Sequence, residues 1–375
     1  MDPDLADNWF FESVKKYASL YIYDLQQPVI SADWISKQGL CVSISNGRKH
    51  EILELSLPDR LLVREEQAAL LKDRDFCVET GGFVEDKVTS LSHLPNTRNV
   101  VASTDVDNSI SILQIGGENS DLISKQQTIV NKTPLHESSQ IGVLSDNQVL
   151  FGSGVNDLCL TDVTKGTIIS HFTGESCKDA LPISCLAPLD GTMCLACERS
   201  RGQTYTIDKR DSKLMCDLDA SFHSNSVITS IHSNGCQGSG ESYWTMCVSP
   251  DMNYIYQISN KGEFRYMDKR NSKNTVTIAT KLSSSSQKIN LSCSSSGKYL
   301  AMSGFDGNIQ IYDINNIITE NKLEAIFKHE GHMANSSQPE TLLSTVHLWY
   351  PGQSELVLSG ASDGSLHAWR PAAFV

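Results

Sequence analysis

The sequence LVLSGASDGSLHAWRPAAFV, residues 356–375, contains two short strand-like runs on either side of Asp363-Gly364. An Asp-Gly pair between alternating apolar and polar residues is a strong sequence signal for a tight two-residue β-hairpin turn. A closely similar stretch, LAMSGFDGNIQIYD, occupies residues 300–313. Two matching hairpins indicate that the sequence is built from repeats.

The repeats continue along the whole chain. Alternating runs of strand length recur between turn residues, and the residue that closes each third run can be marked in seven units. These residues are Glu54, Gln114, Asp162, Asp208, Asp268, Asp313 and Arg370. Their spacing of 45 to 60 residues is close to the roughly 40–50 residues of one propeller blade. The longer intervals contain insertions at about 59–82, 221–242 and 331–341.

Two of the units share a local identity that supports this division. Residues 207–213 read IDKRDSK and residues 267–273 read MDKRNSK. Trp369 stands where a WD-repeat blade carries its tryptophan. We therefore predict an all-β fold, a seven-bladed WD-repeat β-propeller with a short N-terminal α-helix. Closing such a ring removes the exposed sheet edges that invite aggregation.

The N-terminal segment, residues 1–19, is predicted to hold this helix. Over residues 7–20, Phe10, Val14 and Tyr17 recur at helical spacing and form one apolar stripe. The stripe has two interpretations that stay open at this point. The helix packs on the body of its own protein, or it docks on a partner.

The propeller is predicted to occupy residues 20–375. Only six residues follow Trp369, which is too few for another strand and its turn. The run LYIYDL, residues 20–25, comes too early to begin the first unit. We therefore predict that residues 20–25 supply the outer strand of the last blade, so that the two ends of the chain meet in one sheet.

Composition limits the classes of partner. Apolar residues make up 39% and charged residues 20% of the 375-residue chain, which is enough to bury a large core. The net charge of −13 disfavours direct binding to nucleic acid or to anionic membranes. No signal-peptide pattern and no long apolar run is present, and 11 scattered cysteines fit a reducing compartment. We expect a soluble, intracellular protein that is monomeric within a larger complex.

A buried hydrogen-bond chain is predicted in the last unit. In WD blades a histidine, a hydroxyl residue, an aspartate and the tryptophan bond to one another, because buried polar groups need partners. The residues in these positions are His332, Ser359, Asp363 and Trp369. A hydrolase triad is the alternative, because residues 360–364 match G-x-S-x-G. That motif requires a helix after the turn, where a strand is predicted here, so we expect no catalytic residue.

Metal ligation is also considered. Cys194 and Cys197 form a C-x-x-C pair, but they lie in a strand-like run, where positions three apart point to opposite faces. His329 and His332 could hold a metal on one helix face, although Gly331 and the polar residues after it disfavour a helix. The sequence therefore predicts core cysteines, no metal site and no cofactor.

Arg210 and Arg270 each follow the aspartate of their unit by two residues. This spacing resembles the WDxR element of WD-repeat substrate receptors for cullin-RING ubiquitin ligases. The tryptophan of that element is replaced by Ile207 in one unit and by Met267 in the other. A solvated or ion-paired basic turn is the alternative interpretation.

Several segments resemble the WD repeat-containing protein 73 family. The resemblance rests on DNWFFESVKKY (7–17), YIYDL (21–25), HEILELSLPDRL (50–61), RDFCVETGGF (74–83), LPNTR (94–98), SGFDGNIQIYD (303–313), HEGHM (329–333) and HLWYPG (347–352). Residues 115–290 match only as repeats. Trp369-Arg370 departs from the usual Trp-Asp, a change at a surface position.

The resemblance implies a non-enzymatic, largely cytoplasmic protein that is in part nuclear. It further implies a location at spindle poles and the cleavage furrow in mitosis, with a link to microtubule organisation. Implied partners are the Integrator RNA-cleavage subunits and a helical-repeat protein that binds them, with microtubule-associated proteins as further candidates.

The functional hypothesis is a scaffold for protein–protein assembly, and the alternative is a cullin-RING substrate receptor. Large interfaces are usually anchored by aromatic residues and arginine. The candidate contact residues are therefore Trp9, Phe10, Phe11, Arg210 and Arg270.

Overall fold

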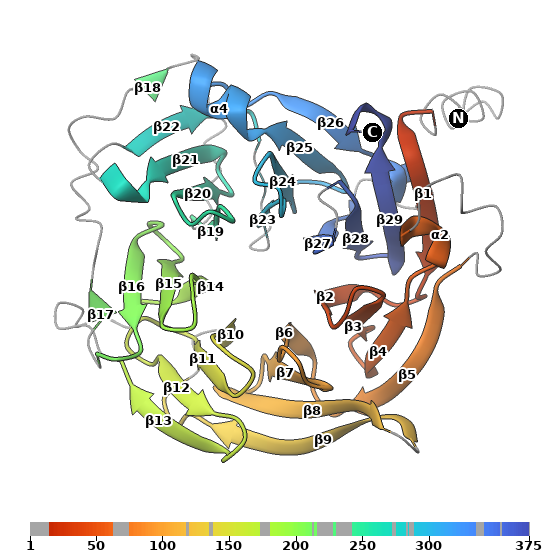
Figure 1. Ribbon diagram of the computed structural model, residues 1–375, viewed down its shortest axis with the longest axis vertical. Coiled ribbons are helices and arrows are strands. Elements are labelled where there is room, and N and C mark those ends of the chain that lie inside the picture. Colours follow the sequence, from red (N-terminus) through yellow and green to blue (C-terminus); the bar gives the residue numbers. More distant parts are fainter. Residues whose placement is uncertain are drawn as a thin grey trace.

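Strand pairing in the computed structural model divides the chain into seven four-stranded blades arranged as a ring (Figure 1). In each blade the first strand lies nearest the centre of the ring (Figure 1). The predicted all-β propeller is thus confirmed for the part of the chain that the structure describes. The described residues are 15–62, 75–117, 120–134, 138–172, 181–211, 214–215, 228–229, 242–271, 275–282, 284, 289–334, 341–352 and 355–374.

The first three blades follow one another along the chain. They comprise β2 (Val29–Trp34), β3 (Gly39–Ser45), β4 (His50–Ser56) and β5 (Cys77–Val84); β6 (Val88–His93), β7 (Asn99–Thr104), β8 (Ser109–Gly117) and β9 (Ser120–Val130); and β10 (Gln140–Val143), β11 (Gln148–Gly152), β12 (Cys159–Asp162) and β13 (Thr167–His171). Blades 1 and 2 are joined at their outer edges by a short parallel pairing of β5 with β9.

Blades 4 to 6 repeat this order. They comprise β14 (Ile183–Pro188), β15 (Met193–Glu198), β16 (Thr204–Asp208) and β17 (Leu214–Met215); β19 (Trp244–Val248), β20 (Tyr254–Ser259), β21 (Glu263–Asp268) and β22 (Thr275–Ala279); and β23 (Asn290–Cys293), β24 (Tyr299–Ser303), β25 (Ile309–Asp313) and β26 (Ala325–His329). The two-residue strand β18 (Ile228–Thr229) pairs with β22.

Blade 7 is built from both ends of the chain. It comprises β27 (Ser344–Trp349), β28 (Val357–Ala361), β29 (Ser365–Pro371) and β1 (Tyr17–Asp24). β1 runs antiparallel to β29, with Leu20 opposite Trp369 and Asp24 opposite Ser365. The first and last described strands, β1 and β29, therefore lie side by side (Figure 1).

The N-terminal segment differs from the prediction at its boundary. The prediction of a helix that continues through residue 19 or 20 is wrong, because Tyr17 already belongs to β1 and the two lysines before it form a turn. Pairing with β29 extends the backbone and overrides the helical spacing of the apolar side chains. Residues 1–14, which carry the rest of the predicted helix, lie outside the described part.

Two further predictions need correction. The predicted insertion at 59–82 includes residues 77–82, which belong to β5. The turn before β29 is a three-residue loop, because β28 ends at Ala361 and Ser365 begins the next strand. Gly364 closes that loop with a positive φ of 94°, a conformation that glycine adopts without a steric penalty.

Helices are short. They comprise α2 (Asp59–Leu62), η1 (Lys269–Asn271), α4 (Ile314–Glu320), α5 (Gly331–Ala334) and η3 (Ala372–Phe374). Among the helices that the structure describes, none has the length and apolar character needed to cross a membrane.

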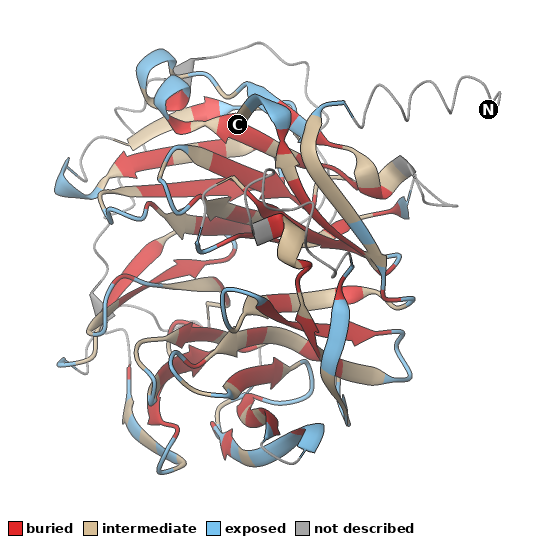
Figure 2. Ribbon diagram, turned by 45° about the vertical axis from the view of Figure 1, so that its right-hand side comes forward, coloured by how far each residue is buried: buried red, intermediate tan, exposed pale blue. Residues whose placement is uncertain are grey.

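The core is a ring of separate apolar clusters, one at each contact between neighbouring blades. The middle strands are buried on both faces, because each face packs on a different neighbour; every residue of β3 and of β28 is buried (Figure 2). Cys194 belongs to the cluster between blades 3 and 4, whereas Cys197 belongs to the cluster between blades 4 and 5. The prediction that these cysteines face opposite ways is confirmed.

Candidate functional site: the closing blade and the turn face

Trp369 anchors a buried hydrogen-bond chain in blade 7. Its side chain is 0% exposed, and its Nε1–H donates to Ser359 Oγ at 3.0 Å. Ser359 Oγ lies 2.9 Å from His332 Nε2. These residues come from β29, β28 and α5, so the chain connects the last two strands to the short helix that precedes the closing blade.

The predicted aspartate joins this chain through Ser365, a residue that was not among the sequence candidates. Ser365 Oγ lies 2.6 Å from His332 Nδ1 and donates to Asp363 Oδ1 at 2.6 Å. Asp363 is exposed, so the chain ends at the surface and not at a buried carboxylate. Every donor in this chain has an acceptor when His332 is neutral with its proton on Nδ1: Nδ1–H donates to Ser365, and Nε2 accepts from Ser359. Burial lowers the pKa of His332 and thereby favours the neutral ring.

Two more histidines pack beside this chain. His329 stacks on Trp369 with ring centroids 4.4 Å apart, and its Nε2 lies 3.1 Å from His367 Nδ1. The other nitrogen of His329 lies 2.9 Å from the hydroxyl of Tyr17 in β1. Burial lowers the pKa of His329, and it lowers the pKa of His367 to about 4. The neutral imidazoles thus link the N-terminal strand to the C-terminal blade.

This histidine cluster has the residue types of a zinc site. One nitrogen from each of His329, His332 and His367 lies within 4.8 Å of the others. However, the rings of His332 and His367 are stacked at 3.9 Å and 13°, so their in-plane lone pairs run parallel and do not converge on one ion. Both nitrogens of His332 also bond to serines. The geometry favours a packing and hydrogen-bond role over metal ligation.

The hydroxyls of blade 7 lack the setting of a nucleophile. Ser359 is 0% exposed, so no substrate carbonyl reaches it. Ser362, the serine of the G-x-S-x-G match, sits in the hairpin loop before the strand β29 and not before a helix. His332, Ser359 and Asp363 therefore form a structural chain in this fold.

Arg210 and Arg270 lie on equivalent turns after β16 and β21. Arg210 donates from its backbone N–H to Asp208 at 3.0 Å, and its guanidinium binds both carboxylate oxygens. Arg270 binds Asp268 in the same way, with a backbone bond of 2.9 Å. The Arg210 guanidinium lowers the pKa of Asp208 to about 2. The sequence identity between residues 207–213 and residues 267–273 thus corresponds to the same turn geometry in blades 4 and 5.

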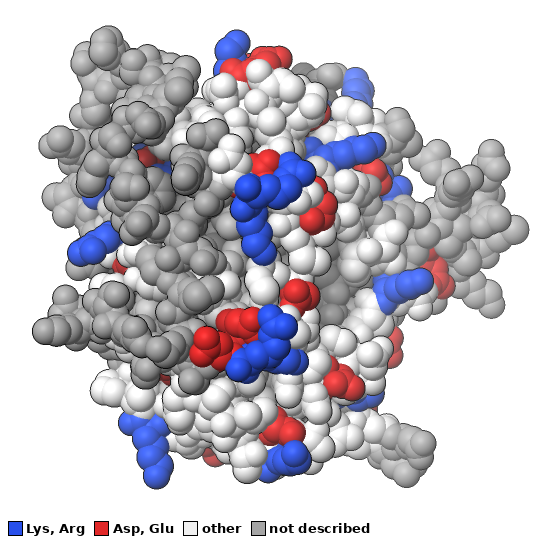
Figure 3. All heavy atoms as spheres, turned by 60° about the vertical axis from the view of Figure 1, so that its left-hand side comes forward, with Lys and Arg blue, Asp and Glu red and all other residues white. Residues whose placement is uncertain are grey.

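Both arginines remain accessible. Their side chains are 69% and 63% exposed, although each is paired with its own aspartate. Figure 3, which brings the left-hand side of Figure 1 forward, shows Lys and Arg side chains lying against Asp and Glu side chains. We call the side of the ring that carries the first-to-second and third-to-fourth strand turns the turn face. Trp9, Phe10 and Phe11, the other candidate contacts, lie outside the described residues.

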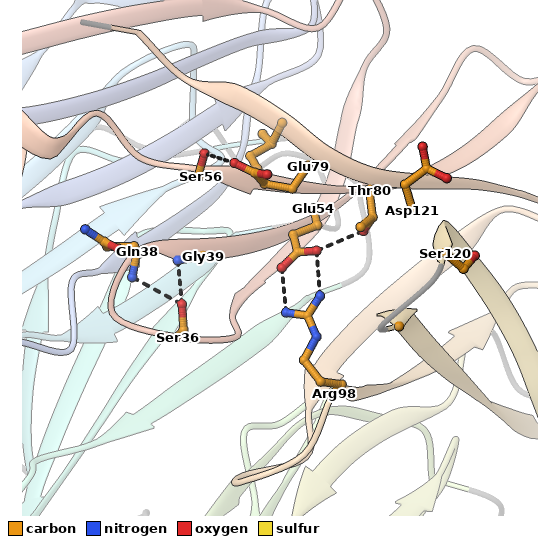
Figure 4. A pocket seen from close by; sticks show the side chains of 12 residues that line it. Ser36, Gln38, Gly39, Glu54, Ser56, Glu79, Thr80, Arg98, Ser120 and Asp121 are labelled. Atoms are coloured by element: carbon orange, nitrogen blue, oxygen red, sulfur yellow. Dashed lines mark hydrogen bonds and ion pairs between the residues drawn. The ribbon is translucent and has the colours of Figure 1, made fainter. Parts of the chain in front are cut away.

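A polar pocket of about 460 Å³ opens on the turn face between blades 1 and 2 (Figure 4). The guanidinium of Arg98 binds both oxygens of Glu54, at 2.7 and 2.8 Å, and Thr80 donates to Glu54 at 2.9 Å. Glu79 and Asp121 add two carboxylates to the lining. The sequence identifies Glu54 as the residue that closes the third strand of the first unit. No sequence signal points to its partner Arg98, which lies in the next blade.

A second pocket, of about 570 Å³, lies between blades 5 and 6 on the same face. Its lining combines the rings of Tyr254 and Tyr299 with Ile314 and Ile318 of the α4 segment, beside Lys298. No sequence pattern indicates this pocket, because α4 follows β25 in a region where only a turn is expected. Aromatic and aliphatic side chains next to charges are typical of a protein-contact surface.

The central cavity is a third candidate. It measures about 330 Å³ and is lined mainly by hydroxyl and amide side chains from the first strands of the blades. Arg199 lies over the ring of Tyr243 at 5.3 Å and supplies the charge at this lining. Among the described lining residues there is no acid or histidine that could serve as a general base.

Comparison with known proteins identifies relatives of this chain. No family model matches the chain. A protein of Danio rerio described as "Integrator complex assembly factor WDR73" is 32% identical over 98% of this chain and 96% of its own length. Proteins of the same description from Xenopus laevis and Homo sapiens are each 28% identical to this chain. The match covers 96% of both chains for the Xenopus laevis protein and 98% of both chains for the Homo sapiens protein. With seven blades closed by its own N-terminal strand, the chain belongs to the WDR73 family of WD-repeat proteins.

Proposed function

We propose that this protein is a non-enzymatic scaffold that helps to assemble the Integrator complex. The observation that carries the proposal is similarity over nearly the whole chain to proteins described as Integrator complex assembly factors. Further support is the site chemistry. Trp369, Ser359 and His332 of the polar chain are buried, and the exposed Arg210 and Arg270 sit on turns, where binding residues concentrate.

We propose the turn face as the partner-binding surface, with the RNA-cleavage subunits and the helical-repeat protein that binds them as the partners. Arg210 and Arg270 project from this face, and the pocket between blades 5 and 6 offers aromatic and aliphatic anchors. Trp9, Phe10 and Phe11 are proposed as a second contact. Arginine and aromatic residues contribute most of the binding energy in typical interfaces.

The test is affinity capture of the tagged full-length protein from cells, followed by mass spectrometry. We expect Integrator subunits to be enriched, and their absence would reject the proposal. The double variant Arg210→Ala with Arg270→Ala should reduce their recovery without changing the melting temperature. Lys261→Ala is the matched control, because Lys261 is exposed on the turn between β20 and β21, on the side of the ring opposite the turn face.

The N-terminal contact is tested in the same assay. Replacing Phe10 and Phe11 by alanine should reduce partner recovery while thermal stability stays nearly unchanged. A large loss of stability in this variant would instead mean that the segment is a structural clasp on the propeller.

A substrate receptor of a cullin-RING ubiquitin ligase is the second candidate function. The observation that favours it is the pair of exposed arginines two residues after their aspartates. If this function holds, the cullin adaptor co-purifies with the wild-type protein and is lost with Arg210→Ala and Arg270→Ala. Integrator subunits without any cullin adaptor in the capture would reject it.

We also propose a mainly cytoplasmic protein with a nuclear fraction, which reaches spindle poles and the cleavage furrow during mitosis. With a net charge of −13 the chain is repelled by other acidic surfaces, so a microtubule-associated protein would bridge it to acidic tubulin. Imaging of the tagged protein through mitosis tests the location. Co-sedimentation with purified microtubules tests the bridge, because direct pelleting would contradict it.

A further inference from the structure

Two cysteines stand directly opposite each other in blade 4. Cys185 in β14 is the register partner of Cys197 in β15, and these strands run antiparallel. Opposite residues of an antiparallel pair point to the same face, with Cα atoms about 4.5–5.5 Å apart. A disulfide forms across Cα separations of roughly 4.4–6.8 Å, so this register lets the two sulfurs bond with little backbone movement.

Both side chains face the contact between blades 4 and 5. Cys197 is part of the apolar cluster there, and Cys185 packs against the same cluster. Ser184 Oγ donates to Cys185 Sγ at 3.9 Å and Gln257 Nε2 donates to Cys197 Sγ at 3.8 Å, and both cysteines are free thiols in the structure. Cys194, the other member of the C-x-x-C motif, points into a different cluster and cannot compete for either sulfur.

The two thiols differ in ways that suit a nucleophile and a resolving thiol. Cys185 is half-buried, and its neighbours in the strand, Ile183 and Ser184, line the central cavity. Hydrogen bonds from Cys197 and Ser184 favour the thiolate and lower the pKa of Cys185. Burial raises the pKa of Cys194 and the other deeply buried thiols in the described part of the chain. Redox-sensing cysteines typically combine thiolate character, access and an adjacent second thiol.

We propose that Cys185 and Cys197 are a peroxide-sensitive thiol pair that forms a reversible disulfide between β14 and β15. The Cys185 thiolate attacks hydrogen peroxide, so that an S–O bond forms, the O–O bond breaks and water leaves after one protonation. Cys185 is then a sulfenic acid, oxidised by two electrons. The Cys197 sulfur attacks it, the S–S bond forms, and the hydroxyl leaves as water with the Cys197 proton. In sum, two thiols and one peroxide give one disulfide and two waters.

Such a bond would be transient in a reducing compartment, where cytosolic disulfides are usually redox-sensing. It would join the innermost strand of blade 4 to its neighbour without opening the ring. Because both sulfurs lie at the cluster between blades 4 and 5, oxidation would alter the packing between these two blades.

The experiment uses the reduced full-length protein. It is treated with hydrogen peroxide, its free thiols are alkylated, and it is digested without reductant for mass spectrometry. We expect a cross-linked peptide pair that joins Cys185 to Cys197 and disappears on treatment with dithiothreitol. Recovery of both cysteines only as alkylated peptides, or a link from Cys185 to another cysteine, would overturn the proposal.

Variants separate the two roles. Cys197→Ser should stall the reaction, so that dimedone labels a sulfenic acid at Cys185, whereas Cys185→Ser should leave Cys197 unlabelled. Cys194→Ser is the matched control and should form the cross-link as the wild type does. Equal dimedone labelling of Cys185 and Cys194 would contradict the assignment. The wild-type peptide map decides whether the disulfide forms even if a variant fails to fold.

Discussion

Replacement of Trp369 by alanine removes the largest fully buried side chain among the described residues. The indole stacks on His329 at 4.4 Å and on Phe327 at 5.5 Å, in the cluster between blades 6 and 7. It also gives Ser359 its hydrogen-bond donor. The variant therefore loses packing between two blades and one end of the polar chain together.

The magnitude follows from these two losses. Truncating a buried aromatic side chain to alanine costs about 3–5 kcal/mol, and leaving a buried hydroxyl without its donor adds roughly 1 kcal/mol. Trp369→Ala should thus lower the free energy of unfolding by about 4–6 kcal/mol, a large share of the 5–15 kcal/mol typical of a folded domain. Trp369→Phe keeps most of the stacking and loses the donor, so it should cost only about 1–2 kcal/mol.

Urea titration of the full-length variants, followed by far-UV circular dichroism, measures these differences. Phe83→Ala is the control, because Phe83 is 72% exposed and its removal should change stability by less than about 0.5 kcal/mol. A loss under about 1 kcal/mol for Trp369→Ala would refute the argument. Equal losses for the alanine and phenylalanine variants would show that the hydrogen bond, and not the packing, dominates.

Three further perturbations test the packing, the ion pair and the buried histidines. Gly331→Ala brings a Cβ within 2.7 Å of a buried histidine ring and should lower the melting temperature, whereas Gly117→Ala meets nothing within 4 Å and should not. Arg98→Ala leaves the buried carboxylate of Glu54 without its cation and should cost roughly 1–3 kcal/mol in urea titration, more than Glu54→Ala, which leaves a half-exposed guanidinium in water. Because the pKa of His367 is lowered to about 4, the unfolded chain takes up that proton first as pH falls. Stability should be constant above about pH 6.5 and fall by roughly 1.4 kcal/mol per pH unit per buried histidine between about pH 6.5 and the lowered pKa, which is about 4 for His367; urea titrations showing a rise on acidification would contradict this.

The strand pattern could be predicted from sequence because it is local. In the sequence, the strand-like runs VISADWI (29–35), GLCVSI (39–44) and HEILELSL (50–57) are separated by turn residues, and they correspond to β2, β3 and β4 with small differences at their ends. Alternation of apolar and polar residues and the turn residues between runs depend only on neighbours in the chain. Counting the units is therefore enough to predict seven blades without any knowledge of contacts.

Side-chain partners could not be predicted, because they depend on register between distant segments. Arg98 meets Glu54 across 44 positions of sequence, and Tyr17 meets His329 across 312. No periodicity encodes either contact. Strand alternation correctly predicts that the two cysteines of the C-x-x-C motif face opposite ways, but the partner of Cys197 is Cys185 across the hairpin, which only the pairing of β14 with β15 reveals.

The N-terminal boundary shows the limit of local patterns in another way. Tyr17 fits both the apolar stripe of a helix over residues 7–20 and the alternation of a strand. The sequence alone could therefore not decide its conformation. In the folded protein its hydroxyl reaches His329 and its ring lies edge-on to Trp369. The residue therefore takes its conformation from the far end of the chain, through the sheet that closes the ring.

The groups that close the ring and the groups available to partners lie in different parts of the molecule. Trp369, Ser359 and His332 are fully buried, and loss of any of them exposes unpaired polar groups within the closing blade. In the part of the chain that the structure describes, Arg210 and Arg270 form ion pairs with aspartates of their own turns, and exposed ion pairs contribute little to stability. Substitutions on the turn face can therefore remove a partner while the propeller stays folded. Substitutions in blade 7 should lower the amount of folded protein and reduce the recovery of all partners together.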